Sequence, residues 1–161
     1  MTEKKAHNRP LHDQVLSGVA RLSPVSVRAR AVIPRGDGIV VSRERRHGRS
    51  LLTVPGGRVD RGETVEATAL REVQEETGLE IELGPLLYVA EVLGSVRRQD
   101  LNLIFLARAS GDPDGEVDVV RPGEDVELLP PILDRIRHDQ ARGWEEMGVW
   151  LGNVWRGDLG R

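Results

Sequence analysis

Apolar and polar positions alternate along residues 25–33, which predicts a strand with one buried face. Arg28 and Arg30 fall on the opposite, polar face of this strand. Similar patterns predict short strands over residues 39–42 and 51–54, joined by a charged loop over residues 43–50. Longer strands are expected over residues 80–93 and 102–109, and a pair of short strands near residues 117–120 and 126–129.

A helical period is clearest over residues 64–77, where Val65, Ala69 and Val73 recur every four positions and predict a buried stripe. Thr64 suits the N-cap of this helix, and Gly78 suits a left-handed C-terminal cap. A second helix is expected over residues 132–142 and a short one around residues 14–22. Strands on both sides of a central helix, followed by a terminal helix, predict an α/β fold with a mixed sheet covered on both faces.

The chain of 161 residues suits one domain, which we place at residues 25–130. Residues 1–24 are polar and are expected to form an N-terminal extension, and residues 131–161 a helical tail. The tail carries Trp144, Trp150 and Trp155, in a chain with one tyrosine and one phenylalanine. Because tryptophan is favoured at packed interfaces, we expect the tail to pack on the domain or on the partner in a homodimer. Stacking of an indole on a nucleobase is the alternative.

Composition removes several classes of chemistry. Cysteine is absent, so disulfides, zinc–thiolate sites and cysteine nucleophiles are excluded. No apolar stretch suits a secretory leader or a membrane span, so we expect a cytoplasmic protein without membrane contact. The net charge of −3 neither favours nor opposes an acidic partner. The basic residues between 43 and 49 can reach an RNA phosphate, although such a loop is more often simply solvated.

Three carboxylates lie within one turn of the central helix. Glu72, Glu75 and Glu76 share an arc of about 100° at 3.6 residues per turn. Like charges on neighbouring turns repel by a few tenths of a kcal/mol, and a hard divalent cation reverses that sign. Oxygen ligands without histidine or cysteine suit Mg²⁺, or Mn²⁺, better than Zn²⁺. A solvated acidic face is the alternative.

The preceding Gly56-Gly57 pair lets the backbone approach a ligand closely, so the loop and the carboxylates are expected to face one cavity.

The segment from Gly57 to Leu79 resembles the Nudix box at every fixed position. The pattern is Gly57, five residues, Glu63, seven residues, Arg71-Glu72-Val73, one residue, Glu75-Glu76, one residue, and Gly78-Leu79. The flanking strands also resemble the family, and the likeness covers about residues 25–129. The resemblance implies a Nudix-type α/β/α sandwich with a mixed β-sheet and a hydrolase of diphosphate linkages.

The resemblance also implies the roles of individual residues. Glu72, Glu75 and Glu76 would hold Mg²⁺ together with the backbone of Gly57, while Arg71 and Glu63 would orient the carboxylates. The family is not uniform in the origin of the general base. Glu76 or Glu75 is the first choice, and the remaining candidates are Glu91, Glu124, Asp125 and Glu127.

The substrate is less closely defined than the chemistry. On the first strand, Arg28 and Arg30 are candidate phosphate ligands. The downstream proline of ADP-ribose hydrolases and the tyrosine of diadenosine-polyphosphate hydrolases are both absent from residues 94–97. A nucleoside di- or triphosphate or a nucleotide sugar is therefore expected as a small nucleotide substrate. Two alternatives are an RNA 5′-pyrophosphohydrolase docking RNA on residues 43–49, and a non-catalytic nucleotide-sensing module. The complete set of box glutamates counts against the second.

Overall fold

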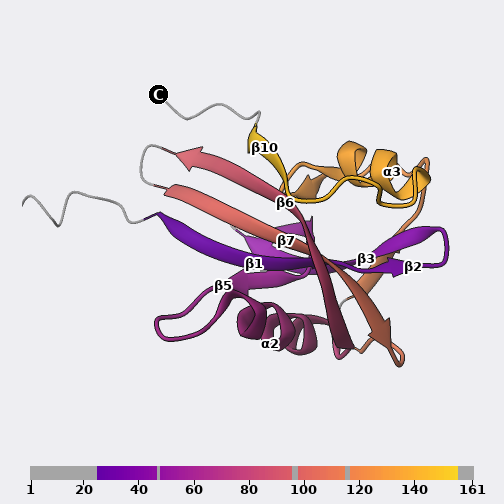
Figure 1. Cartoon of the computed structure of the whole chain (residues 1–161), viewed down its shortest axis with the longest axis horizontal. Helices are drawn as coiled ribbons and strands as arrows, with labels where there is room; N and C mark the ends of the chain where they lie inside the picture. The colour runs from indigo at the N-terminus through magenta and orange to yellow at the C-terminus, as the bar shows by residue number, and fades with distance from the viewer. Residues whose placement is uncertain (1–24, 47, 96–97, 115–116, 156–161) are drawn as a thin grey trace, which may run out of the picture.

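The computed structural model describes residues 25–46, 48–95, 98–114 and 117–155, which fold into two mixed five-stranded sheets and two helices (Figure 1). The first sheet has the strand order β10-β6-β7-β1-β5, with bounds Val149–Asn153, Glu80–Ser95, Arg98–Ser110, Ser26–Val32 and Gly56–Arg58. The helices are α2 (Val65–Thr77) and α3 (Leu133–Ala141). The short helix expected around residues 14–22 lies outside the described residues. Neither helix of the described ranges has the length and apolar character of a membrane span.

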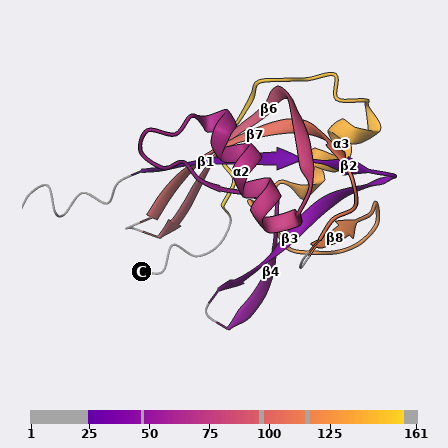
Figure 2. The ribbon, with the colours of Figure 1, turned by 90° about the horizontal axis from the view of Figure 1, so that it is seen from below.

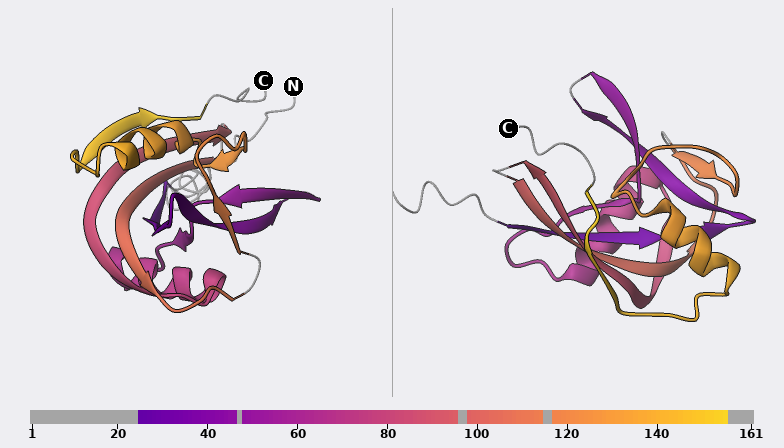
Figure 3. Two further views of the ribbon diagram at one scale, coloured as in Figure 1. Left: turned by 90° about the vertical axis from the view of Figure 1, so that its right-hand side faces the viewer. Right: turned by 90° about the horizontal axis from the view of Figure 1, so that it is seen from above.

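Strand β1 lies inside the first sheet, parallel to β7 and antiparallel to β5. Strands β6 and β7 form a long antiparallel pair, and β10 adds to β6 in parallel. Figure 3 shows this pair curving around the molecule, with α2 at one end of the curve and α3 and β10 at the other. The α/β architecture with helices on opposite sides of the strands is therefore confirmed.

The second sheet contains β2 (Pro34–Arg35), β3 (Gly38–Arg46), β4 (Arg49–Thr53), β8 (Val117–Val120) and β9 (Leu128–Leu129). Strands β3 and β4 pair from Ser42↔Thr53 to Arg46↔Arg49 and form a hairpin that extends from the body of the molecule (Figure 2). The charged loop expected over residues 43–50 is therefore wrong, because the paired backbone carries these polar side chains on strands. The expected pairing of residues 117–120 with 126–129 is also wrong, since β8 pairs with β3 and β9 with β4.

Helix α2 begins and ends where local chemistry predicts. The Thr64 side chain accepts a hydrogen bond from the Ala67 amide at 3.1 Å. Gly78 has a left-handed φ of 70° and donates its amide to the Gln74 carbonyl, a conformation that costs glycine little. Val73 and Ala69 are fully buried beneath the helix. The carboxylate-bearing turn is thereby held in one orientation against β1, β5 and β6.

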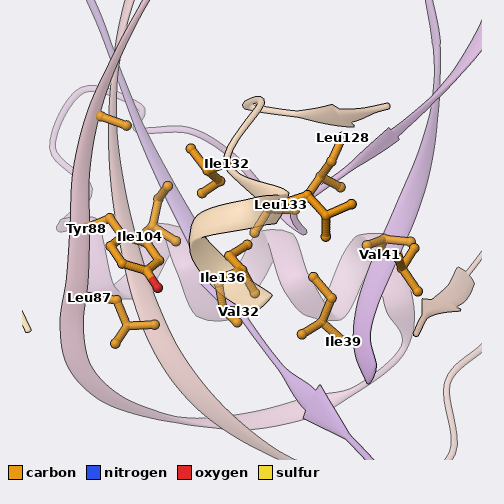
Figure 4. Close-up of a cluster of buried hydrophobic side chains, with 13 residues drawn as sticks. Val32, Ile39, Val41, Leu87, Tyr88, Ile104, Leu128, Ile132, Leu133 and Ile136 are labelled. Atoms are coloured by element: carbon orange, nitrogen blue, oxygen red, sulfur yellow. The ribbon is translucent and has the colours of Figure 1, made fainter. Parts of the chain in front are cut away.

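Strand β1 separates two apolar clusters. The smaller lies under α2 and includes Ala31, Ile33 and Val73. The larger includes Val32 and Ile136 and packs α3 against both sheets (Figure 4). Because both faces of β1 are covered, the polar outer face predicted from the alternation is wrong, and Arg30 is only 4% exposed.

The carboxyl-terminal segment folds onto the first sheet instead of forming a helix alone. A strand at residues 149–153 was not predicted, and it pairs with β6 from Val149↔Tyr88 to Asn153↔Glu91. Helix α3 is also linked to β6, through the buried side chain of Asp139. The Tyr88 hydroxyl donates to the Asp139 carboxylate at 2.6 Å, and Arg135 Nε donates to it at 2.6 Å. Burial and the neighbouring Asp139 carboxylate raise the pKa of Tyr88.

We expect Tyr88→Phe to lower the free energy of unfolding by about 1–3 kcal/mol, because Asp139 remains buried and loses one of its donors. Urea denaturation followed by far-UV circular dichroism measures the change. Trp150→Phe, at a side chain that is 59% exposed, is the control and should change stability little. Equal stability of Tyr88→Phe and the wild type would show that Arg135 alone satisfies Asp139.

Candidate active site

The site is built on the close approach of two backbone segments. Strand β5 pairs Gly56 with Arg30 and Gly57 with Ala29. A Cβ at Gly56 would lie 2.2 Å from the Ala29 carbonyl oxygen, and its φ of 133° is one that other residues rarely adopt. Only glycine therefore allows β5 to lie this close to β1, and the position of α2 follows from that contact.

Gly57 leaves space for a carboxylate of α2. A Cβ at this position would lie 2.2 Å from Glu72 Cδ and 2.4 Å from each carboxylate oxygen. The Glu72 side chain thus occupies the volume that any other residue would fill. The sequence predicted that Gly57 and Glu72 face one site, and the structure places them in contact.

Glu76 lies against Gly56, the residue that precedes Gly57 on β5. Its carboxylate accepts hydrogen bonds from Ser42 Oγ at 2.8 Å and from the Gly56 amide at 3.1 Å. Ser42 Oγ is also 2.8 Å from Thr53 Oγ1, so β3 and β4 both contribute to this polar pocket. Burial raises the pKa of Glu76 despite the two hydrogen bonds, which lower it.

Arg71 separates and balances the negative charges. Its guanidinium binds Glu63 through two hydrogen bonds of 2.9 Å and donates to Glu72 Oε1 at 2.9 Å. Glu75 Oε2 lies 3.5 Å from the same guanidinium, on a side chain that is 61% exposed. The Arg71 hydrogen bonds lower the pKa of Glu63 to about 2, so this carboxylate is charged whenever the protein is folded near neutral pH.

In this structure Glu72 and Glu75 share Arg71 as a partner, whereas Glu76 has partners of its own. Within the described ranges, no group of three histidine or acidic side chains stands close enough to form a ready-made metal site. Glu72 turns towards Gly57 and Arg71, and Glu76 towards Ser42 and Gly56. The donor set still fits Mg²⁺, because two carboxylates approach adjacent residues of β5 and supply only oxygen ligands.

A cavity of about 930 Å³ lies between the two sheets. Its walls come from β1, β3, β4, β6, β7, β9 and the segment after β10. Thr53 lines this cavity and, through Ser42, connects it to Glu76. The volume lies in the range of pockets that hold small organic ligands. A ligand that reaches the carboxylates therefore has room for a further group on this side.

Arg28 and Arg30 both line the cavity, but their environments differ. Arg30 is buried and donates to Asn102 Oδ1 at 2.9 Å and to the carbonyls of Val54 at 2.5 Å and Gly56 at 3.2 Å. Its first role is therefore to hold the β4–β5 connection. Arg28 Nε lies 3.4 Å from Asp100 Oδ2, with a side chain that is 17% exposed. Binding of substrate by either arginine stays a prediction.

The other candidates for the general base are dispersed. Glu127 lines the cavity, whereas Glu124 and Asp125 are exposed beyond it. Glu91 accepts a hydrogen bond from Gln99 on the neighbouring strand. In the basic hairpin, Arg49 reaches the cavity and Arg43 pairs with Asp118 at 2.5 Å. His47 lies outside the described residues.

Residues 25–148 match the family model of the NUDIX domain, which is more than half of the chain. The chain belongs to the Nudix family. It is a hydrolase of the Nudix type, and the general reaction of such enzymes is hydrolysis of a pyrophosphate linkage.

Known relatives agree with this assignment. A Mycobacterium tuberculosis protein named mutator protein MutT4 is 50% identical over 40 residues, which cover 25% of this chain and 16% of the relative's length. A MutT NUDIX hydrolase of Burkholderia pseudomallei is 25% identical, covers 73% of this chain and 98% of its own, and superposes with a TM-score of 0.60. A NUDIX hydrolase of Nitrosomonas europaea is 19% identical over 80% of this chain and 78% of its own, with a TM-score of 0.65.

Several residues of this Nudix site were not singled out in the sequence. Ser42 and Thr53 come from strands whose pairing brings their hydroxyls together, and Asn102 is fixed on β7 by Arg30. No local pattern distinguishes these residues from ordinary polar positions.

Alanine at the two glycines should have different effects. Gly56→Ala places its Cβ against the backbone of Ala29 in a strained conformation, so we expect a loss of stability of about 1–3 kcal/mol or more. Gly57→Ala meets the end of a flexible side chain, and Glu72 moves at little cost to the fold. Chemical denaturation of both variants measures the difference. Equal losses would show that Glu72 is held more rigidly than its contacts indicate.

Glu63 should make stability depend on pH in acid. Its pKa is lowered from 4.5 to about 2 on folding, so its contribution is fully present above pH 4.5 and is lost as the pH falls towards 2. We expect the difference in unfolding free energy between the wild type and Glu63→Gln to shrink across that interval. Urea titrations at a series of pH values measure it. A difference that is independent of pH would contradict the pairing with Arg71.

Proposed function

We propose that this Nudix hydrolase cleaves the diphosphate linkage of a nucleoside diphosphate derivative, either a nucleoside di- or triphosphate or a nucleotide sugar, with Mg²⁺ as its cofactor. One observation carries the proposal. Strand β5 meets Glu72 at Gly57 and Glu76 at Gly56, so two carboxylates of the box approach consecutive backbone residues. A solvated acidic helix face would have no reason to be in contact with a glycine strand.

Glu72 and Glu76 would hold the cation, with Gly57 giving the close backbone approach and Glu75 adding a third carboxylate from the same turn. Mn²⁺ suits the same oxygen ligands. When bound, the cation would neutralise the phosphate oxygens and lower the pKa of a bound water.

The remaining residues of the box hold and orient these ligands. Arg71 is fixed by its two hydrogen bonds to Glu63 and donates to one oxygen of Glu72, which leaves the other oxygen of Glu72 without that donor. Glu76 is proposed as the general base that takes a proton from the attacking water, with Glu75 as the alternative.

The cavity between the sheets supports a small nucleotide as substrate. It adjoins Glu76 through Thr53 and Ser42, so a diphosphate at the carboxylates leaves its organic group on the cavity side. RNA docked on the hairpin at residues 43–49 is the alternative substrate. Turnover of RNA should weaken steeply with salt, because many phosphates would be contacted, and turnover of a small nucleotide should not.

Glu76→Gln separates a catalytic role from a structural one. The amide still accepts hydrogen bonds from Ser42 and Gly56 but loses the charge, so we expect the rate of diphosphate hydrolysis to fall by roughly 10² or more. The folded protein raises the pKa of Glu76, so the charged form is disfavoured by folding at neutral pH. Stability of the metal-free variant should therefore stay level or rise. Phosphate release over a nucleotide panel and thermal melting measure both effects.

Glu66→Gln is the matched control, because Glu66 is exposed in the first turn of the same helix. It should leave the rate unchanged and keep the rise in melting temperature on adding Mg²⁺, which Glu76→Gln should reduce. Normal turnover of Glu76→Gln, together with equal stabilisation of both variants by Mg²⁺, would remove Glu76 from the metal site and from the reaction.

A further inference from the structure

The three tryptophans of the carboxyl-terminal segment have different surroundings. Trp144 packs against the larger apolar cluster, and Trp150 is 59% exposed on β10. Trp155 alone of the three lines the cavity between the sheets. Trp144 thus packs on the domain, partly buried, and the packing of the whole tail on the domain or on a homodimer partner stays a prediction.

Hydrogen bonds of the Asn153 side chain and of the backbone fix the chain next to Trp155. Asn153 Oδ1 accepts from the Trp155 amide at 3.2 Å and from the Leu93 amide at 3.4 Å. The Val154 amide donates to the Glu91 carbonyl at 3.0 Å. The chain after β10 is thus fastened across β6, and its next side chain reaches the cavity wall.

Among the described residues, the indole ring of Trp155 has no polar contact that would explain its position. Trp155 Nε1 is buried and has no hydrogen-bond partner among the described residues. A buried tryptophan ordinarily pairs this N–H when its role is to hold the fold. Trp155 therefore lines the cavity without a hydrogen bond from its indole N–H to any described residue.

The rest of the wall suits a flat ring with polar edges. Leu51, Val92 and Pro130 add apolar surface, and Arg28, Glu44 and Asn102 add donors and acceptors from three strands. Sugars lack a π-face, whereas every nucleobase has one and stacks on aromatic side chains.

We infer that Trp155 stacks on the nucleobase of the substrate and that the segment after β10 is a specificity-determining wall of the site. The inference rests on the proposed function, because it assigns the cavity to the group attached to the diphosphate. Trp155 discriminates between substrates by the presence of a planar base, and Asn153 is its positioning residue.

Binding of reaction products tests the inference without catalysis. The probes are the four nucleoside monophosphates, with ribose 5-phosphate as the baseless control, titrated calorimetrically without divalent cations. We expect Trp155→Ala to weaken the binding of at least one nucleoside monophosphate by about 5- to 150-fold, the range for stacking of one base. Binding of ribose 5-phosphate should be unchanged. Trp155→Phe should retain most of the affinity, and Trp150→Ala all of it. Asn153→Ala should weaken only the ligands that carry a base.

A second measurement does not depend on removing Trp155. The chain contains three tryptophans, so Trp144→Phe combined with Trp150→Phe leaves Trp155 as the single indole. A nucleoside monophosphate stacked on it should quench its fluorescence, and ribose 5-phosphate should not. Three results would each overturn the inference. They are the absence of quenching, an equal loss of affinity for nucleoside monophosphates and ribose 5-phosphate in Trp155→Ala, and no binding of any nucleoside monophosphate by the wild type.

The two proposals fail in different ways. Hydrolysis of a nucleotide with normal KM in Trp155→Ala would overturn stacking and leave the proposed function intact. Base-dependent quenching in a protein that hydrolyses no diphosphate would overturn the proposed function and support the stacking site.

Discussion

The site depends on one steric constraint, the absence of side chains at two consecutive positions of β5. Without a Cβ at Gly56, β5 lies directly against β1, and without one at Gly57, a carboxylate of α2 lies directly against β5. The helix, the strand and the central sheet therefore meet at backbone distance. Caps at both ends of α2 then fix which turn faces the strand. The geometry of the carboxylates is a consequence of backbone packing before any ligand is considered.

Crowded negative charge is the second constraint, and the protein meets it with fixed donors. Arg71 binds Glu63 and Glu72 on one side, while a hydroxyl and an amide bind Glu76 on the other. Each carboxylate is oriented by a partner that forms part of a strand or of the same helix. If these side chains hold a cation as proposed, Glu72 and Glu76 would lose little further conformational entropy on binding it.

The sequence predicts the local parts of this molecule well and the long-range parts poorly. Helix α2, its caps and the contact of Gly57 with Glu72 follow from spacing within a segment of 23 residues. The burial of Arg30 and the strand at residues 149–153 depend on partners far along the chain, whereas the extension of the β3–β4 hairpin was missed although its two strands are neighbours in the sequence. The alternation of apolar and polar residues predicts that Arg30 is exposed, because no nearby residue indicates that Asn102 and two backbone carbonyls surround it.

Strand β10 pairs with β6 in parallel at the edge of the first sheet. One wall of the cavity is therefore attached to the domain differently from the carboxylates. The glycines lie on β5, the opposite edge strand of this sheet, where α2 and its carboxylates cover them, whereas the last cavity wall is held by β10 and a few hydrogen bonds of the backbone and of the Asn153 side chain. Edge strands open at lower free energy than the interior of a sheet. Release of β10 would remove one wall of the cavity and leave the carboxylates in place. The cavity wall that carries Trp155 therefore depends on the pairing of one edge strand with β6.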